Sequence, residues 1–146
     1  MALTRDFKEF IALLNDDDVR YLIVGGYAVA FHGHPRYTKD LDIWIDPKRE
    51  NIDKLLRTLD QFGFGSLGLK PEDFSDPEEI VQLGLPPNRI DLFTGLKGVA
   101  FNRCFDAKSE IEIDGVTAYV IDLEGLKKNK KATGRPQDLA DLSNLE

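Results

Sequence analysis

Two aspartates at alternate positions are the residues best placed to do chemistry. Asp40 and Asp42 alternate with Leu41, Ile43 and Ile45. In a β-strand, side chains two residues apart point to the same face, so the carboxylates would project together, roughly 6.5–7 Å apart along the chain. They would repel each other unless a cation lies between them, and Mg²⁺ takes such oxygen ligands together with substrate phosphates. Taken alone, the alternation favours an exposed strand face with two solvated acids.

A third carboxylate changes that preference. Asp91 lies in a short alternating run, residues 89–93, between Ile90 and Leu92. Paired beside the first strand, this run could bring Asp91 against Asp40 and Asp42. Three carboxylates of this kind are what a two-metal phosphoryl-transfer site uses, with ions about 3.5–4 Å apart. The alternative is that Asp91 caps the strand or pairs with Arg89.

A glycine pair precedes the first two acids. An apolar run, residues 21–24, ends in Gly25-Gly26, and a short helical segment over residues 27–31 follows. Glycines at this position allow positive φ and close approach of a ligand to the backbone, and the N–H groups that open a helix attract anions. The turn therefore suits the phosphates of a nucleotide. It also suits any tight strand-to-helix connection.

A basic run near the C-terminus is the remaining charged feature. It comprises Lys127, Lys128, Lys130, Lys131 and Arg135. Such a run usually forms a solvated face. The alternative is a cationic wall opposite the acids, which would hold triphosphate or a nucleic-acid backbone.

Three other patterns are not assigned to a site. The segment 63–68 matches the dinucleotide fingerprint G-x-G-x-x-G, but it follows a predicted helix and opens a loop, which is the wrong context. His32 and His34 have no cysteine or third histidine to complete a tetrahedral metal site. Cys104 lies in a predicted helix, where a small core residue is expected rather than a nucleophile.

Composition sets the outer bounds. The chain has 146 residues, 42% of them hydrophobic, with a formal net charge of −7 and a single cysteine. This length predicts a single domain, 1–146, with its own core. One cysteine fits a reducing cytoplasm. The absence of a signal segment and of an apolar run near 20 residues predicts no membrane association, and the negative charge argues against broad nonspecific nucleic-acid binding.

The elements that must position these residues follow from periodicity. Strands are predicted at 19–24, 40–45, 89–93, 109–113 and 116–121, and Asp114-Gly115 predicts a hairpin between the last two. Thr4 is a candidate N-cap for a first helix. Asp46 and Pro47 predict the N-cap and first residue of a second. A further short helix is expected from Asp76.

The combined motifs resemble the polymerase-β-type nucleotidyltransferase superfamily. They are Gly-Gly, Arg-x-Thr-x-Asp-Leu-Asp-Ile, Arg-Ile-Asp-Leu and Asn-Lys-x-x-x-Gly-Arg-Pro-x-Asp-Leu-x-Asp-Leu, in that order. Within the superfamily the match is to small proteins related to the abortive-infection (AbiEii-type) toxins. The resemblance implies an α+β fold: a single nucleotidyltransferase domain with a short mixed β-sheet and helices packed mainly on one face.

The resemblance also implies roles for individual residues. Asp40, Asp42 and Asp91 would bind Mg²⁺ or Mn²⁺, with Asp91 near the acceptor hydroxyl as a candidate base, and Lys130 would neutralise triphosphate charge. These four would form the catalytic group. The nucleotide-binding residues would be Gly25, Gly26, Arg36, Thr38, Lys130, Arg135 and Asp138.

Two functions follow from this reading. The first is an Mg²⁺-dependent, two-metal nucleotidyltransferase. It would move a nucleoside monophosphate from a nucleoside triphosphate (NTP) to a hydroxyl on RNA, protein or a small molecule, as a candidate toxin–antitoxin component with a cognate partner. The second is an inactive nucleotide-binding or antitoxin-like module. Keeping three acids and the basic run favours the enzyme, whereas the small size favours the module.

Overall fold

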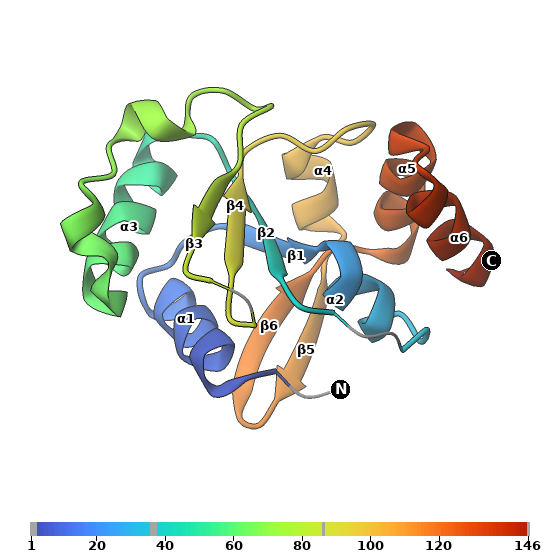
Figure 1. The fold of residues 1–146 in the computed structure, drawn as a ribbon, viewed down its shortest axis with the longest axis horizontal. Helices are drawn as coiled ribbons and strands as arrows, with labels where there is room; N and C mark the ends of the chain where they lie inside the picture. The colour runs from blue at the N-terminus through green and yellow to red at the C-terminus, as the bar shows by residue number, and fades with distance from the viewer. Residues whose placement is uncertain (1–2, 36–37, 86, 146) are drawn as a thin grey trace.

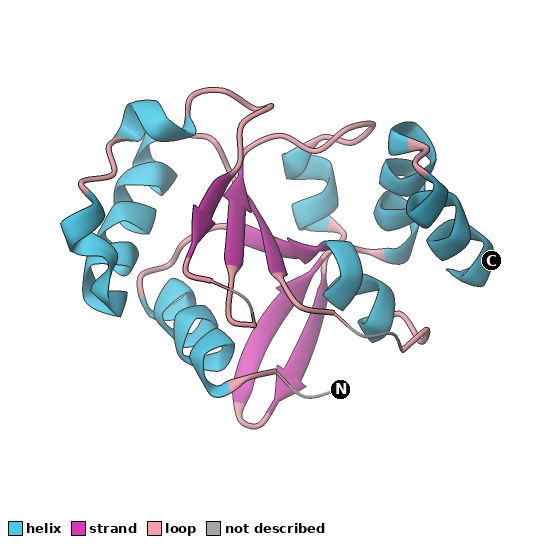
Figure 2. Ribbon diagram, in the orientation of Figure 1, coloured by secondary structure: helices cyan, strands magenta, loops and turns pink. Residues whose placement is uncertain are grey.

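A mixed β-sheet forms the centre of the molecule. The structure, a computed structural model, describes residues 3–35, 38–85 and 87–145. Within those ranges the sheet has six strands in the order β3-β4-β2-β1-β6-β5 (Figure 1, Figure 2). The strands are β1 (Tyr21–Val24), β2 (Leu41–Ile45), β3 (Val81–Leu83), β4 (Ile90–Phe93), β5 (Ser109–Ile113) and β6 (Val116–Val120). The predicted α+β class and mixed sheet are confirmed.

Strand β2 lies inside the sheet and fixes its register. It pairs antiparallel with β1 and parallel with β4, which places Asp42 directly opposite Asp91. On the far side of β1, strand β6 runs parallel to it and forms an antiparallel hairpin with β5. The hairpin turn has positive φ at both Asp114 and Gly115, the geometry that Asp-Gly favours.

Strand β3 was not predicted. The helix expected from Asp76 does not form: the Asp76 carboxylate accepts the backbone N–H of Glu78 at 2.9 Å, and its carbonyl accepts that of Glu79 at 3.1 Å, which closes a single turn. The chain then extends and pairs antiparallel with β4 at the edge of the sheet. With three residues, this strand is too short for alternation to reveal it.

One face of the sheet is covered by α1 (Arg5–Asp16) and α3 (Arg49–Leu59), which contact each other. Thr4 caps α1 as predicted, accepting the N–H of Phe7 at 3.2 Å. Tyr21 of β1 reaches Asn15 of α1 with its hydroxyl at 3.0 Å. Helix α3 begins later than predicted, because the Asp46 carboxylate pairs with Arg20 at 2.8 Å and accepts the N–H of Lys48.

The other helices lie against the opposite face and beyond one end of the strands. Trp44, which points away from α1, packs edge-on against Phe101 of α4 (Phe101–Asp106), with ring centroids 5.1 Å apart. Helix α2 (Gly25–Phe31) follows β1 directly. Helices α5 (Leu123–Thr133) and α6 (Pro136–Leu145) pack together beside α2 (Figure 1). No helix in the described part of the chain is both long and apolar enough to cross a membrane.

The segment 60–74 leaves α3 as three short turns of helix, η1 (Asp60–Phe64), η2 (Gly65–Leu67) and η3 (Pro71–Phe74). It contains the rejected glycine fingerprint. That fingerprint follows a helix here rather than a strand, so the local structure needed to bind a dinucleotide does not form.

Candidate active site

The three predicted acids come together at adjacent positions on β2 and β4. Asp40 immediately precedes β2, Asp42 is its second residue, and Asp91 is the second residue of β4. Because Asp42 and Asp91 are register partners in a parallel pair, their side chains share one face of the sheet. Asp91 is buried, whereas Asp42 is half-buried. The sheet therefore concentrates three carboxylates with little solvent between them.

Arg89 is the first neutralising partner of this cluster. Its Nη2 donates to Asp40 Oδ2 at 2.6 Å, and its Nε and Nη2 donate to the two oxygens of Asp91 at 3.0 and 3.2 Å. The backbone carbonyl of Arg89 accepts the N–H of Leu41 at 3.1 Å, which anchors the residue to β2. The sequence left open whether Asp91 joins the other two acids or pairs with Arg89. In the structure it does both.

The pKa values show that mutual repulsion remains. Burial, reinforced by the neighbouring carboxylates of Asp91 and Asp40, raises the pKa of Asp42 to about 7, although Lys130 and Arg89 act in the opposite direction. Burial also raises the pKa of Asp91, although its hydrogen bonds from Arg89 oppose the shift. Carboxylates with such raised values are stabilised by an added cation.

The glycine turn lies directly against these acids. Gly25 has a φ of +66°, and a Cβ at this position would collide with Asp42 Oδ2. Only glycine satisfies both the conformation and the space. Gly26 is buried in the first turn of α2. The glycine pair thus brings bare backbone next to the carboxylate of Asp42.

Lys130 lies on the opposite wall, but its ammonium is not free. The side chain is buried in α5 and pairs with Asp138 Oδ1 at 3.2 Å and Asp141 Oδ2 at 3.1 Å, both on α6. Arg135 donates from Nε to Asp138 Oδ2 at 2.7 Å. Burial alone would raise the pKa of Asp138, but hydrogen bonds from Arg135, Thr133 and Lys130 hold it well below its usual range. These contacts join α5 to α6.

The three acids and the glycine pair line a cleft of about 750 Å³ together with Lys130, Arg135 and Asp138, and we call it the acid cleft. This volume suits one small-molecule ligand. The charged residues and glycines that line this cleft include Gly25, Gly26, Asp40, Asp42, Asp91, Lys97, Lys130, Arg135 and Asp138. The cleft also has an apolar side, which is formed by Pro77, Ile80, Phe93 and Leu96 next to Glu78. Thr38 is half-buried in the loop before β2 and is not one of the residues that line the cleft; Arg36 lies outside the described residues.

The donor set of the acid cleft fits a hard divalent cation in its chemistry. Carboxylate oxygens are the ligands that Mg²⁺ and Mn²⁺ prefer. Asp40 Oδ1 is buried and has no hydrogen-bond partner, which is costly unless a ligand completes it. Across residues 3–35, 38–85 and 87–145, no three His, Cys, Asp or Glu side chains are arranged to hold one metal ion together.

Comparison with known proteins places the sequence in a family. A model of the family described as "Nucleotidyltransferase of unknown function (DUF6036)" matches residues 1–146. The chain belongs to this nucleotidyltransferase family. The predicted resemblance to nucleotidyltransferases is thereby confirmed. No curated protein sequence matches the chain significantly.

Solved structures show the same fold at low sequence identity. A proposed nucleotidyltransferase from Thermotoga maritima has a TM-score of 0.63 at 16% identity, covering 98% of this chain and 94% of that one. The lincosamide antibiotic adenylyltransferase LnuA, with lincomycin bound, has a TM-score of 0.59 at 16% identity, covering 99% and 96%. The antibiotic-resistance factor ANT(2″)-Ia has a TM-score of 0.62 at 14% identity, covering 96% and 80%. The fold is therefore that of the nucleotidyltransferases.

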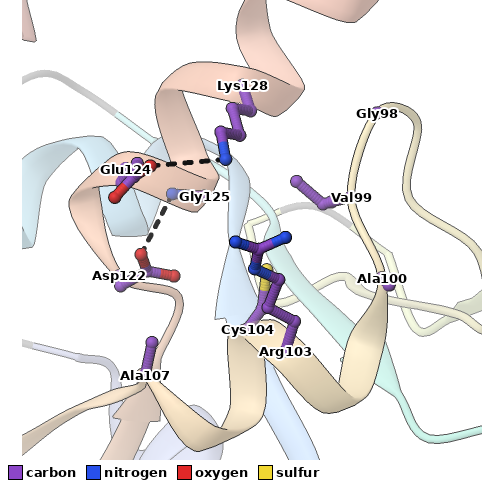
Figure 3. A pocket seen from close by; sticks show the side chains of 10 residues that line it. All are labelled: Gly98, Val99, Ala100, Arg103, Cys104, Ala107, Asp122, Glu124, Gly125 and Lys128. Carbon is purple, nitrogen blue, oxygen red and sulfur yellow. Dashed lines mark hydrogen bonds and ion pairs between the residues drawn. The ribbon is translucent and has the colours of Figure 1, made fainter.

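A second cavity, of about 480 Å³, lies between α4 and α5 (Figure 3). Arg103 and Lys128 extend into it, and Lys128 pairs with Glu124 at 3.3 Å. Burial, reinforced by the nearby Asp122 carboxylate, raises the pKa of the Cys104 thiol to about 11. The thiol is therefore protonated at neutral pH, which fits the predicted core role rather than a nucleophile.

Three residues of the site were missed from the sequence. Asp141 follows Asp138 by one helical turn, and this i, i+3 spacing in α6 predicts a shared face. Lys97 lies in the loop after β4, next to the acids, and its carbonyl accepts the Asn129 side chain of α5 at 3.0 Å. Arg89 bridges Asp91 and Asp40. The sequence indicated its pairing with Asp91, two residues away, but gave no indication of its pairing with Asp40.

Proposed function

We propose that the protein is an Mg²⁺-dependent nucleotidyltransferase that moves a nucleoside monophosphate from an NTP to a hydroxyl acceptor. One observation carries the proposal: Asp40, Asp42 and Asp91 meet beside the Gly25-Gly26 turn in a single cleft. Membership of a nucleotidyltransferase family supports it. Nucleotidyl transfer needs phosphate binding, charge neutralisation and a proton acceptor, and this cleft offers a group for each.

The triphosphate would lie between the glycine turn and the basic wall. Gly25 and Gly26 line the cleft and place no side chain between their backbone and a phosphate oxygen. Lys97 is exposed at the rim and has no ion pair with the described residues, so its charge is available to the pyrophosphate portion. Arg135 is also exposed at the rim, but it shares its charge with Asp138. Lys130 is buried behind this rim, where it shares its charge with Asp138 and Asp141.

Asp40 and Asp42 would hold the divalent cation, with Asp91 beside them. When bound, such an ion neutralises phosphate charge and favours departure of pyrophosphate. The chain's own contribution is to fix the carboxylates on paired strands before the substrate arrives. Fixed placement removes the need for reorganisation during the reaction, which is a large part of catalysis.

Asp91 would act as the base. The acceptor oxygen forms a bond to the α-phosphorus, the bond from that phosphorus to the β-phosphate oxygen breaks, and the hydroxyl proton passes to the Asp91 carboxylate. Burial raises the pKa of Asp91, which improves a carboxylate as a proton acceptor near neutral pH. Pyrophosphate leaves on the side of Lys97 and Arg135.

The acceptor would enter along the apolar side of the cleft. Pro77, Ile80, Phe93 and Leu96 offer surface for a compound with an apolar face, and Glu78 would repel a polyanion. This favours a small molecule over RNA. LnuA binds lincomycin and ANT(2″)-Ia has been seen with adenylyl-2″-tobramycin, so small hydroxylated acceptors are compatible with the fold. A protein acceptor, a toxin–antitoxin role with a cognate partner and a cytoplasmic location stay predictions from the sequence.

Following the label from the α-phosphate tests the proposal. The protein is incubated with each α-³²P-labelled NTP, Mg²⁺, and total RNA, soluble protein or a small-molecule extract in parallel. We expect label in the small-molecule pool, and none with Asp42→Asn, whose side chain keeps the shape but loses the charge. Label in no pool at any NTP would contradict the enzymatic function.

A second function has one observation in its favour. Arg89 already pairs with Asp40 and Asp91. A protein that binds no catalytic metal would require such a counter-charge for its clustered carboxylates. Such a protein would be a nucleotide-binding or antitoxin-like module. It would show an NTP-dependent rise in melting temperature without transfer of label, which separates it from the enzyme in the same samples.

A further inference from the structure

We propose that the acid cleft holds one divalent cation rather than two. Asp40 Oδ1 and Asp42 bind it, and the guanidinium of Arg89 serves at Asp91 as a permanent second positive charge. This inference rests on the proposed function and specifies its metal content. It also removes Asp91 from the predicted set of metal ligands.

The hydrogen bonds of Asp91 are the first reason. Arg89 donates to both of its oxygens, at 3.0 and 3.2 Å, in the two-pronged geometry that makes arginine–carboxylate pairs strong. A divalent ion at Asp91 would have to lie against this guanidinium or displace it. Displacement is opposed because the backbone of Arg89 is held to Leu41 of β2.

Asp40 presents the opposite situation. Arg89 occupies its Oδ2 at 2.6 Å, whereas Oδ1 is buried without any hydrogen-bond partner. A buried carboxylate oxygen without a donor is unfavourable. Asp42 follows Asp40 by two residues, and both line the acid cleft. The open coordination capacity of the cluster therefore lies at Asp40 Oδ1 and at Asp42, while Arg89 already donates to both oxygens of Asp91.

The charges agree with a single ion. The three carboxylates carry three negative charges when ionised, and Arg89 supplies one positive charge. One divalent cation brings the cluster to neutrality, while a second would leave it with two excess positive charges in a partly buried place. Lys130 and Arg135 leave this sum unchanged, since the two negative charges of Asp138 and Asp141 balance their two positive charges.

Counting bound Mn²⁺ tests the inference without any turnover. Electron paramagnetic resonance of the free and bound ion, in the absence of nucleotide, should give one site per chain for the wild-type protein. Asp91→Asn should keep that site, whereas Asp40→Asn should weaken Mn²⁺ binding at least tenfold. Arg89→Gln should gain a second site, and Arg49→Gln, which removes an exposed arginine paired with Asp53, should not.

Each contrary result has a distinct meaning. Two sites in the wild-type protein, or equal losses from Asp91→Asn and Asp40→Asn, would overturn the single-ion arrangement and leave nucleotidyl transfer intact. No bound Mn²⁺ at all would overturn the single-ion site in the nucleotide-free protein, whereas nucleotidyl transfer is tested separately by following the α-phosphate label. The Asp40 and Asp91 comparison does not depend on Arg89→Gln remaining folded.

Discussion

Replacing Lys130 by Met would leave two buried aspartates facing each other without their shared counter-charge. Asp138 and Asp141 are each 1% exposed, and both pair with the Lys130 ammonium. Breaking a buried ion pair by removing one partner typically costs about 3–5 kcal/mol. Arg135 still pairs with Asp138, so we expect the lower end, about 3 kcal/mol.

For a domain of this size each kcal/mol lowers the melting temperature by about 2–4 °C, so Lys130→Met should melt roughly 6–12 °C below the wild-type protein. Differential scanning calorimetry measures this directly. The matched control is Lys131→Met, which changes an exposed lysine one residue away and should stay within about 0.5 kcal/mol of wild type. Equal melting temperatures for the two variants would refute the buried ion pair.

The structure thereby changes an expectation drawn from the basic run. If the basic run is a cationic wall opposite the acids, the sequence predicts that Lys130→Ala lowers turnover at least a hundredfold (about 10²–10³ for loss of such a donor) with little change in melting temperature. Loss of turnover is still expected, but a loss of stability should accompany it. Adding Asp141→Asn to Lys130→Met should restore part of the melting temperature, because it removes one of the two buried negative charges that shared the Lys130 ammonium.

Three further predictions concern other parts of the molecule. Gly25→Ala should abolish NTP binding in a thermal-shift assay, whereas Gly68→Ala, at a nearly equal φ of +64° but with open space around it, should bind normally. The thiol of Cys104, whose pKa is raised to about 11, should react with iodoacetamide far more slowly at pH 7.5 than after unfolding; equal rates would contradict its burial. Because the folded pKa of Asp138 lies below its usual 3.8, it contributes stability above that value and loses it at lower pH. Asp138→Asn should therefore lose less stability than wild type between about pH 6 and pH 3.

The strands were predictable wherever alternation or a continuous apolar run extended over four or more residues. The predicted strands at 19–24 and 40–45 differ from β1 and β2 by two residues or fewer at each end. Strand β3 exists because β4 offers it hydrogen bonds, and that tertiary cause leaves no pattern in three residues. The predicted start of α3 was wrong for a similar reason, since Arg20, which is distant in sequence, donates a hydrogen bond to the Asp46 carboxylate.

The site was predictable in its residue types and not in its pairings. Alternation identified Asp40, Asp42 and Asp91, and the register of two parallel strands brought them together. Side-chain orientation decides the rest. Packing between elements far apart in sequence decides whether Arg89 faces solvent or spans two carboxylates. It also decides whether Lys130 is solvated or buried.

The central claim is that this cleft breaks the bond between the α- and β-phosphates of an NTP and transfers the nucleotide. The most direct measurement uses one NTP labelled with ³²P at the α-position in one reaction and at the γ-position in a parallel one, with Mg²⁺ and the small-molecule pool. We predict α-label in the acceptor and γ-label in pyrophosphate, in equal amounts, with both lost in Asp42→Asn. Release of γ-label as orthophosphate, or its appearance in the acceptor, would contradict nucleotidyl transfer.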